Sequence, residues 1–380
     1  MYDEAVDNPA WPELQEAQRS VLIDLLIHGS RSRAELARRS GLSRASLTRL
    51  TRSLIDLGLV SEGDTRPLAG RGRPSELLEL RPGSAHFVGF KLTGDAVYVA
   101  LTDLSASVLH SEEHALGSRD VDSVVGLMAD IVASLRVAYP RISAVGVCLA
   151  GDVQISRGRT FIVGSAFLGW DEVPLAELVQ IATGLPTAIA NDVQSLTAAH
   201  HWFGAGVGYR SMALIGFGAG IGCGVVVNDE LVDGSHGHPG RVGHLTVRSD
   251  GPLCDKGHPG CVASYVTDDA IIQNSGVEGA TYADIVGLAK SGHPQSVVAF
   301  QEAAEALAVA VAHVVNLLDV EVVIVTGEGL AVVDLAGAEF ESMLRRRRDP
   351  EGIDTNVVFP SFNFVDYARA AAIGAVRLVV

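Results

Sequence analysis

The chain has 380 residues, of which 48% are hydrophobic, 19% are charged and 6% are aromatic, and its formal net charge is −16. This length predicts two or three domains with a large core, and this composition excludes a disordered chain. Four cysteines are too few for a disulfide framework, and acidic first residues with no run of about 18 apolar residues predict a cytoplasmic protein without a membrane partner.

Charge is distributed unevenly along the chain. Residues 28–75 contain ten arginines and four carboxylates, whereas residues 81–380 contain 18 basic and 33 acidic residues. A basic segment attracts nucleic-acid phosphates and releases their counterions, whereas an acidic body is repelled by them. The asymmetry favours nucleic-acid binding by the N-terminal end. The alternative is an arginine-rich surface that reflects only base composition, since the chain has just three lysines.

The N-terminal segment predicts three helices. Apolar residues at helical spacing indicate a first helix over residues 14–28. A short second helix follows over 33–40, and Gly41 supplies a tight turn. Ser43 is the expected N-cap of a third helix that runs to about Leu57.

Three residues give this segment the spacing of a helix-turn-helix. Ala37 allows close helix crossing, Gly41 turns the chain, and Leu47 packs the second helix of the motif. Short polar and guanidinium groups on the outer face can reach phosphates and base edges in a major groove. The predicted DNA-binding residues of this helix are Ser43, Arg44, Ser46, Thr48, Arg49 and Arg52.

A β-hairpin wing is predicted after residues 58–60. Its tip, Gly70–Pro74, contains Arg71 and Arg73, which we expect to contact DNA in a minor groove. A solvated linker is the alternative for this tip, and a winged helix used for protein contacts is the alternative for the whole segment. The prediction is an all-α winged helix-turn-helix with a β-wing over residues 1–80.

From residue 85 the pattern becomes that of an α/β fold with two lobes. The expected elements are strands at 86–93, 96–103 and 142–151, a helix near 121–138, a strand pair joined by a glycine turn at 211–227, a strand at 322–329 and a closing helix at 367–378.

Four motifs of this body are informative together. They are Asn191-Asp192 before a helix that ends at 202–206, the glycine loop 218–224, the segment 237–244, and the cysteines within 254–261. These motifs resemble those of the ROK family of sugar kinases and repressors. The resemblance implies two ribonuclease-H-like lobes of the actin-like ATPase fold. The first lobe is expected at 81–200, completed by a C-terminal helix at 366–380, and the second, with the dimerisation surface and effector loop, at 201–365.

The resemblance also bears on catalysis. Asp192 corresponds to the family's catalytic base, but the kinases' phosphate loop, Asp-Ile-Gly-Gly-Thr-Lys, is replaced by Lys91-Leu-Thr-Gly-Asp-Ala96. A cation therefore replaces the leading carboxylate, and a phosphate-binding glycine is lost. We expect no enzyme activity, no ATP binding and a vestigial Asp192. The alternative is a sugar kinase or phosphosugar-binding enzyme with an accessory DNA-binding domain.

The effector site implied by the family comprises Asn191, Asp192, Arg241 and His244. Sugar-binding members carry glutamates at the positions of Arg241 and Ala263, so two acceptors of sugar hydroxyl groups are lost here. This change predicts an anionic effector, a sugar acid or sugar phosphate, paired with Arg241. The alternative is that Arg241 folds onto Asp192 or another carboxylate and the cleft is empty.

Family regulators hold a structural zinc ion with one histidine and three cysteines. The corresponding positions here are His244, Cys254, Lys256 and Cys261, and a protonated lysine is not a ligand. The site is therefore either degenerate or completed by His258 or water. Reduced thiols in a metal-free loop are the alternative.

These observations together predict a transcriptional regulator, acting as a repressor of carbohydrate-related genes. Its expected partners are a double-stranded DNA operator and a sugar-derived effector. Because a two-fold operator needs two recognition helices, the expected assembly is a homodimer or homotetramer.

Overall fold

The computed structural model of the protein describes residues 11–66, 75–156, 158–235, 237, 239–352 and 355–380. The chain divides into two compact units. The first unit contains Met1–Gly208 and Val365–Val380, and the second contains Tyr209–Phe364. The N-terminal helices and the first α/β lobe therefore belong to the same unit.

The three predicted N-terminal helices are confirmed. Gly41 follows the second helix with a φ of 67°, in the left-handed region that favours glycine. Ser43 caps the third helix, because its Oγ accepts a hydrogen bond from the Ser46 N–H at 3.1 Å. The elements are α1 (Glu16–His28), β1 (Arg31–Ser32), α2 (Arg33–Ser40), α3 (Arg44–Asp56), β2 (Val60–Arg66) and β3 (Ser75–Leu80).

The strands of this segment form an antiparallel sheet in the order β1-β3-β2, which confirms the winged helix-turn-helix architecture. Leu22, Leu25 and Leu54 are fully buried in its core. The tip of the wing lies outside the described residues, and so do Arg71 and Arg73.

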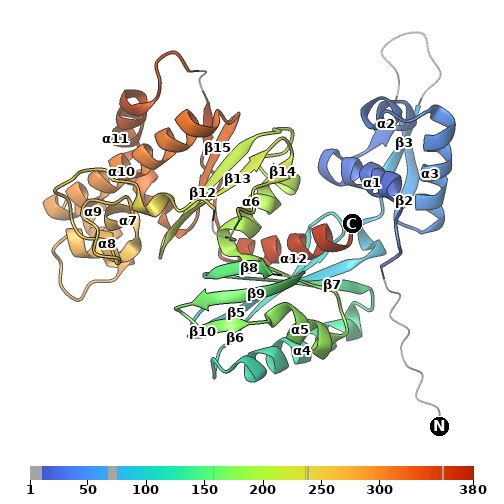
Figure 1. Cartoon of the computed structure of the whole chain (residues 1–380), viewed down its shortest axis with the longest axis horizontal. Helices are drawn as coiled ribbons and strands as arrows, with labels where there is room; N and C mark the ends of the chain where they lie inside the picture. The colour runs from blue at the N-terminus through green and yellow to red at the C-terminus, as the bar shows by residue number, and fades with distance from the viewer. Residues whose placement is uncertain (1–10, 67–74, 157, 236, 238, 353–354) are drawn as a thin grey trace. The chain divides into compact units, whose positions relative to one another are not determined.

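The first lobe is built on a five-stranded sheet in the order β11-β7-β4-β5-β6. Helices α4 and α5 cover one face, and α12 covers the other (Figure 1). A small antiparallel sheet, β10-β9-β8, extends this lobe. The elements are β4 (His86–Leu92), β5 (Ala96–Asp103), β6 (Val108–Ala115), α4 (Val121–Ala138), β7 (Ile142–Leu149), β8 (Asp152–Ser156), β9 (Arg159–Ser165), β10 (Trp170–Val173), α5 (Leu175–Thr183), β11 (Thr187–Asn191), α6 (Asp192–Phe203) and α12 (Val365–Val379).

Helix α12 completes this lobe from the far end of the sequence. It packs closely on Gly89 of β4 and Gly146 of β7, which are register partners in the sheet. A Cβ at Gly89 would lie 1.9 Å from the backbone oxygen of Ala368, so only glycine allows this approach. The close packing brings Tyr367, at the start of the helix, to the carboxyl ends of the strands.

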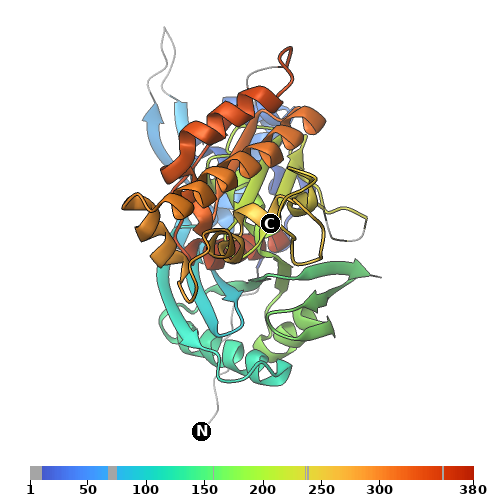
Figure 2. The same ribbon diagram turned by 90° about the vertical axis from the view of Figure 1, so that its left-hand side faces the viewer.

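The second unit contains another five-stranded sheet, in the order β14-β13-β12-β15-β16. Figure 2 shows α10 and α11 side by side over this sheet. The elements are β12 (Met212–Phe217), β13 (Ile221–Val227), β14 (Glu230–Leu231), η2 (Val242–His244), α7 (Ala263–Val266), α8 (Asp268–Asn274), α9 (Tyr282–Lys290), α10 (Pro294–Leu318), β15 (Val322–Thr326), η3 (Glu328–Leu330), α11 (Ala331–Arg347) and β16 (Asn356–Val358).

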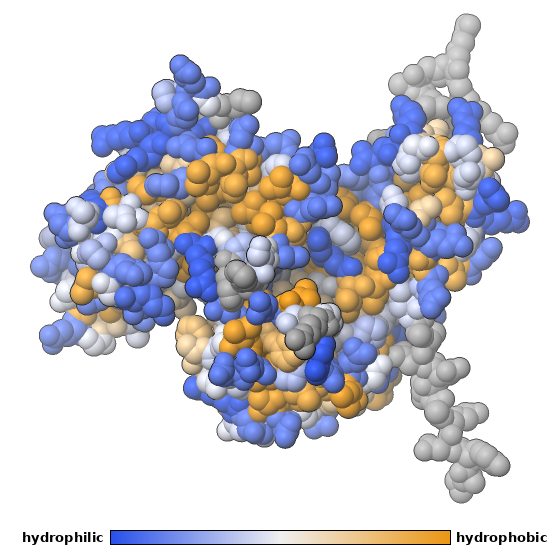
Figure 3. Space-filling model, viewed as in Figure 1, coloured by the Kyte–Doolittle hydropathy of each residue, from blue (hydrophilic) through white to orange (hydrophobic). Residues whose placement is uncertain are grey.

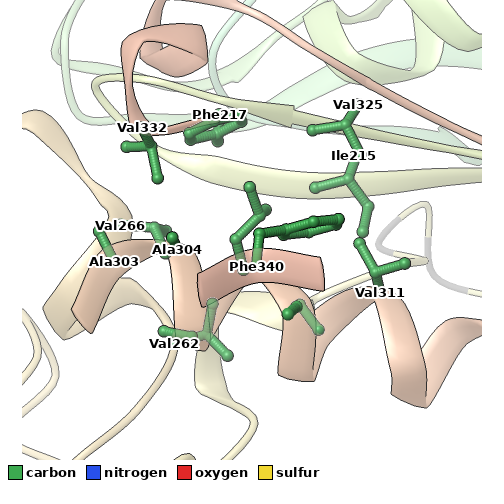
Figure 4. Close-up of a cluster of buried hydrophobic side chains, with 14 of the residues drawn as sticks. Ile215, Phe217, Val262, Val266, Ala303, Ala304, Val311, Val325, Val332 and Phe340 are labelled. Atoms are coloured by element: carbon green, nitrogen blue, oxygen red, sulfur yellow. The ribbon is translucent and has the colours of Figure 1, made fainter. Parts of the chain in front are cut away.

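The core of the second unit lies between its sheet and its helices. Ile215 and Val325 of the sheet face Val311 of α10 and Phe340 of α11 (Figure 4). Helix α10 is long and apolar enough to cross a membrane, but 67% of its most apolar window is buried inside the protein. Its apolar character is therefore accounted for by its place in the core.

Candidate functional site

The outward face of α3 carries the predicted DNA-binding side chains. Arg44, Arg49 and Arg52 are exposed, as are Ser43 and Thr48, whereas Ser46 is half-buried. Leu47, Thr51 and Leu54 occupy the opposite, buried face. Figure 3 shows hydrophilic residues along the outer edge of this domain. The helix therefore has an apolar side that fixes it to the domain and a cationic side that faces solvent.

Pairing separates the arginines of this domain into two groups. Arg33 forms ion pairs with Glu62 of β2 and Glu76 of β3, and Arg39 pairs with Asp24 of α1. Within the described part of the chain, no hydrogen bond or ion pair involves the guanidinium groups of α3. The paired arginines hold the domain together, while those of α3 keep their donors for another molecule.

A buried ion pair involves Asp192, the residue for which the sequence resemblance implies the role of a vestigial catalytic base. Nζ of Lys91, on β4, lies 2.5 Å from Oδ2 of Asp192, the first residue of α6. The two side chains are 5% and 13% exposed. The same ammonium group lies 4.3 Å from the centre of the Tyr367 ring, a cation–π contact. The negative charge of Asp192 is therefore neutralised by a lysine of the same lobe.

Asn191 has a structural role at the same place. Its Oδ1 accepts hydrogen bonds from the N–H groups of Val193 and Gln194, and its amide donates to the Gly151 oxygen at 3.0 Å. These bonds cap α6 and orient its first turn. The other two predicted effector residues, Arg241 and His244, are exposed and border η2 of the second unit. The four predicted residues are therefore divided equally between the two units.

The second unit places carboxylates beside its glycine turn. The Gly218 N–H donates to the Gly220 oxygen at 2.9 Å, and the Asp268 N–H donates to the Gly218 oxygen at 2.9 Å. Burial, aided by the negative charges of Glu328 and Asp269, raises the pKa of Asp268 to about 6. Acidic groups at a glycine turn oppose the binding of a nucleotide phosphate there. Sequence reasoning missed this feature, because Asp268 and Glu328 are far apart in the chain.

The raised pKa of Asp268 predicts a pH-dependent stability. The unfolded chain releases this proton near pH 4 and the folded chain near pH 6, so stability is lost as the pH rises through this window. Asp268→Asn should stabilise the protein by about 1–2 kcal/mol at pH 8, after allowance for solvent screening, and by less at pH 4.5. Urea unfolding at both pH values measures the difference. Asp233→Asn, at an exposed position of the same unit, is the control and should change stability little at either pH. Equal gains at both pH values in the Asp268 variant would contradict the prediction.

The predicted metal ligands come together in one loop. The ligand atoms of His244, Cys254, His258 and Cys261 all lie within 4.8 Å of one another. The Cys254 N–H donates to the His258 oxygen at 2.9 Å, which folds the loop so that His258 joins the cluster. Lys256 is turned to Asp255, with an Nζ to Oδ2 distance of 3.0 Å. Two thiols and two imidazoles match a tetrahedral structural zinc site, so these residues fit the metal.

Comparison with known proteins agrees with the architecture. The sequence model of the ROK family matches residues 87–379, and that of the IclR helix-turn-helix domain matches residues 21–63. A xylose repressor from Caldicellulosiruptor bescii is 26% identical over 315 residues, which are 77% of this chain and 78% of the relative.

Solved structures show the same fold. A ROK family transcriptional regulator, a homolog of the Escherichia coli Mlc protein, superposes with a TM-score of 0.80 at 24% identity and covers 96% of each chain. A ROK family glucokinase from Streptomyces griseus, in complex with glucose and AMPPNP, gives a TM-score of 0.65 at 24% identity. It covers 77% of this chain and 100% of the kinase.

Proposed function

Because this chain belongs to the ROK family and its N-terminal segment matches a helix-turn-helix domain, we propose that it is a DNA-binding transcriptional regulator of carbohydrate-related genes. It acts as a repressor on a double-stranded operator, as a homodimer or homotetramer in the cytoplasm. The observation that carries this proposal is the exposed arginine face of α3, whose guanidinium groups have no ion pair with any residue that the structure describes.

The arginines of α3 have a measurable role in this proposal. Arg49→Ala should weaken binding to a duplex from the protein's own promoter by about tenfold, because one guanidinium contact to DNA contributes about 1–3 kcal/mol. If the contact is to a phosphate, the slope of log affinity against log salt should fall by about one. Fluorescence anisotropy of a labelled duplex measures the affinity and its salt dependence. The salt concentration is varied from about 50 to 200 mM, the range over which the affinity of phosphate contacts changes strongly.

The control is Arg210→Ala, since Arg210 is an exposed arginine of the second unit that pairs with Asp229. This variant should bind DNA like the wild type. Equal losses in the two variants, or none in Arg49→Ala, would rule out α3 as the recognition element.

We also propose that the protein transfers no phosphate. The Lys91 ammonium group pairs with Asp192, so this carboxylate is not free to accept a proton from a sugar hydroxyl. Asp268 and Glu328 add negative charge beside the glycine turn of the second unit. Transfer of labelled phosphate from ATP to glucose or xylose by the purified protein would support the kinase alternative instead.

The proposed effector is a sugar derivative held by Asn191, Asp192, Arg241 and His244. Arg241 makes an acidic or phosphorylated sugar the fitting class, because a guanidinium group binds carboxylates and phosphates through paired hydrogen bonds. Calorimetry with gluconate, glucose 6-phosphate and glucose distinguishes the ligand classes. Binding of glucose alone would exclude an anionic effector.

We further propose that His244, Cys254, His258 and Cys261 hold a structural zinc ion. Four protein ligands leave no open position, so the metal would stabilise the loop and not activate water. Nδ1 of His244 lies 3.8 Å from the Cys254 sulfur, which leaves Nε2 to donate a hydrogen bond to the effector. His258 would thus take the place of the cysteine missing at Lys256.

Zinc content tests this assignment. Native mass spectrometry should find one zinc ion per chain, and competition with a chromophoric chelator should give at least tenfold weaker affinity for His258→Ala, because one of four ligands is lost. Lys256→Ala is the matched control from the same loop and should keep the wild-type affinity. If His258→Ala binds zinc as tightly as the wild type, His258 is not a ligand.

A further inference from the structure

Two adjoining cavities lie where the winged-helix segment meets the first lobe, within the first unit. Their volumes are about 370 and 360 Å³, in the range of small-molecule sites. Arg81, Ser84 and Arg141 line both cavities. We call the two together the Arg81–Arg141 pocket. Trp11 and Leu57 also line the smaller of the two cavities.

The pocket is cationic, although the chain as a whole carries a net charge of −16. Among the residues that the structure describes, its lining contains two guanidinium groups and no carboxylate. Arg141 donates one hydrogen bond from its guanidinium group to the Gly83 oxygen, at 3.1 Å. Within the described residues, neither Arg81 nor Arg141 forms an ion pair, so most of their donors are available. Two such groups in one hollow favour an anion with several oxygen atoms.

Neutral polar atoms of the pocket also lack partners. Nε1 of Trp11 and Oγ of Ser84 are buried, and neither has a hydrogen-bond partner among the described residues. Buried donors of this kind are normally satisfied, so an oxygen-rich ligand or water would complete them. The Trp11 ring, packed on Phe87 at 5.9 Å between centroids, and Leu57 add apolar wall to the same hollow.

We propose that the Arg81–Arg141 pocket binds a small phosphorylated compound of about sugar-phosphate size. The phosphate contacts the two guanidinium groups and the Ser84 hydroxyl, and the remainder of the ligand lies against Trp11. A phosphate fits better than a single carboxylate, because its three terminal oxygens can accept from several converging donors.

The pocket is placed to influence DNA binding. Leu57 is the C-cap of α3, and the Arg81 N–H donates to the Leu59 oxygen at 2.9 Å. A ligand here contacts both the end of the recognition helix and the lobe that follows it. A ligand that binds more tightly to one orientation of the winged helix than to another would increase the population of the first orientation. This input is separate from the effector site proposed above.

Calorimetry on the full-length protein tests the proposal, with glucose 6-phosphate, inorganic phosphate and glucose as probes. The two phosphate compounds should bind, and the double variant Arg81→Ala/Arg141→Ala should weaken glucose 6-phosphate by at least tenfold. In Arg241→Ala, which lacks the anion-binding group of the proposed effector site, one site for glucose 6-phosphate should remain, and adding the two pocket substitutions to this variant should remove it. Both pocket arginines are exposed, so the double variant should fold, which its melting temperature verifies.

Trp11→Phe provides a second readout. Glucose 6-phosphate should change the tryptophan fluorescence of the wild type, and this change should be absent from the variant, which retains Trp170 and Trp202. The proposal is overturned if the wild type binds neither phosphate compound, or if binding is unaffected in the double variant. Loss of glucose 6-phosphate binding only in Arg241→Ala would assign the phosphate to the effector site instead.

Discussion

Lys91→Met should lower the free energy of unfolding of the first unit by about 3 kcal/mol, because it leaves the Asp192 carboxylate without its cation in a largely buried position. Losses of this kind are usually about 3–5 kcal/mol. We place this one at the low end, since Oδ1 of Asp192 keeps the hydrogen bond from the Val193 N–H at 2.9 Å and the amino end of α6 favours a negative charge.

A double-mutant cycle isolates the ion pair. Asp192→Asn alone should also destabilise the protein, because it leaves a buried ammonium group without a carboxylate. The variant with both substitutions should be more stable than the sum of the single losses predicts, with a coupling energy of about 2 kcal/mol. Denaturant unfolding, followed by a probe in the first unit, measures all four proteins.

Lys290→Met is the matched control, since Lys290 is exposed in the last turn of α9. It should change stability by less than about 0.5 kcal/mol. If Lys91→Met also changes the free energy of unfolding by less than this amount, the ion pair does not stabilise the protein. Asp192 would then not be held by Lys91, and it could accept a proton from a sugar hydroxyl.

The elements that sequence predicts well are those set by neighbouring residues. The helix-turn-helix follows from apolar spacing, a left-handed Gly41 and the Ser43 cap, all within a short segment, and the structure confirms each of them. The predicted strands of the two lobes, which are β4, β5, β7, β12, β13 and β15, are confirmed for the same reason, because continuous apolar runs and glycine turns are local signals. The remaining strands of the lobes were not predicted.

Contacts between distant residues are what the sequence could not provide. Lys91 and Asp192 are 101 positions apart, so the lysine could be identified as a departure from the kinase pattern but not as a partner of the base position. Counting arginines likewise did not distinguish Arg33, which is tied to the wing strands, from the arginines of α3. Charge counts give composition, whereas pairing depends on tertiary packing.

The cluster of His244, Cys254, His258 and Cys261 could be predicted only in part from the sequence. Spacing alone left either His258 or water as the fourth ligand. The hydrogen bond between the Cys254 N–H and the His258 oxygen brings the imidazole to the two thiols, while Lys256 turns to Asp255. This turn geometry is local, but a sequence pattern does not specify which of two neighbouring side chains points inward.

Gly146→Ala should destabilise the first unit by about 3 kcal/mol or more, because α12 lies directly against this glycine. A Cβ at residue 146 would lie 1.7 Å from the Ala371 oxygen and 2.5 Å from the Ala371 carbonyl carbon. Both atoms are backbone, so no change of rotamer relieves the overlap. The helix must move away from the sheet, which opens voids along its alanine-rich face.

The displacement of α12 should also reach the Lys91–Asp192 pair. Tyr367, in the first turn of this helix, holds its ring 4.3 Å from the Lys91 ammonium group. Stability lost in Gly146→Ala should therefore not add simply to that lost in Lys91→Met, and the combined variant measures the coupling. Independent sites would instead give additive losses.

Gly126→Ala, in the interior of α4, is the control for the loss of a glycine. Apart from its chain neighbours and the adjacent backbone of α4, no heavy atom lies within 4 Å of the position that its Cβ would take, so alanine should stabilise the helix by up to about 1 kcal/mol. Unfolding should be followed in the first unit alone, since two units need not unfold together. If the free energy of unfolding rises in Gly126→Ala and falls in Gly146→Ala, the β7 glycine is needed because α12 packs closely against it. The loss in Gly146→Ala would then not be a general effect of replacing a flexible glycine.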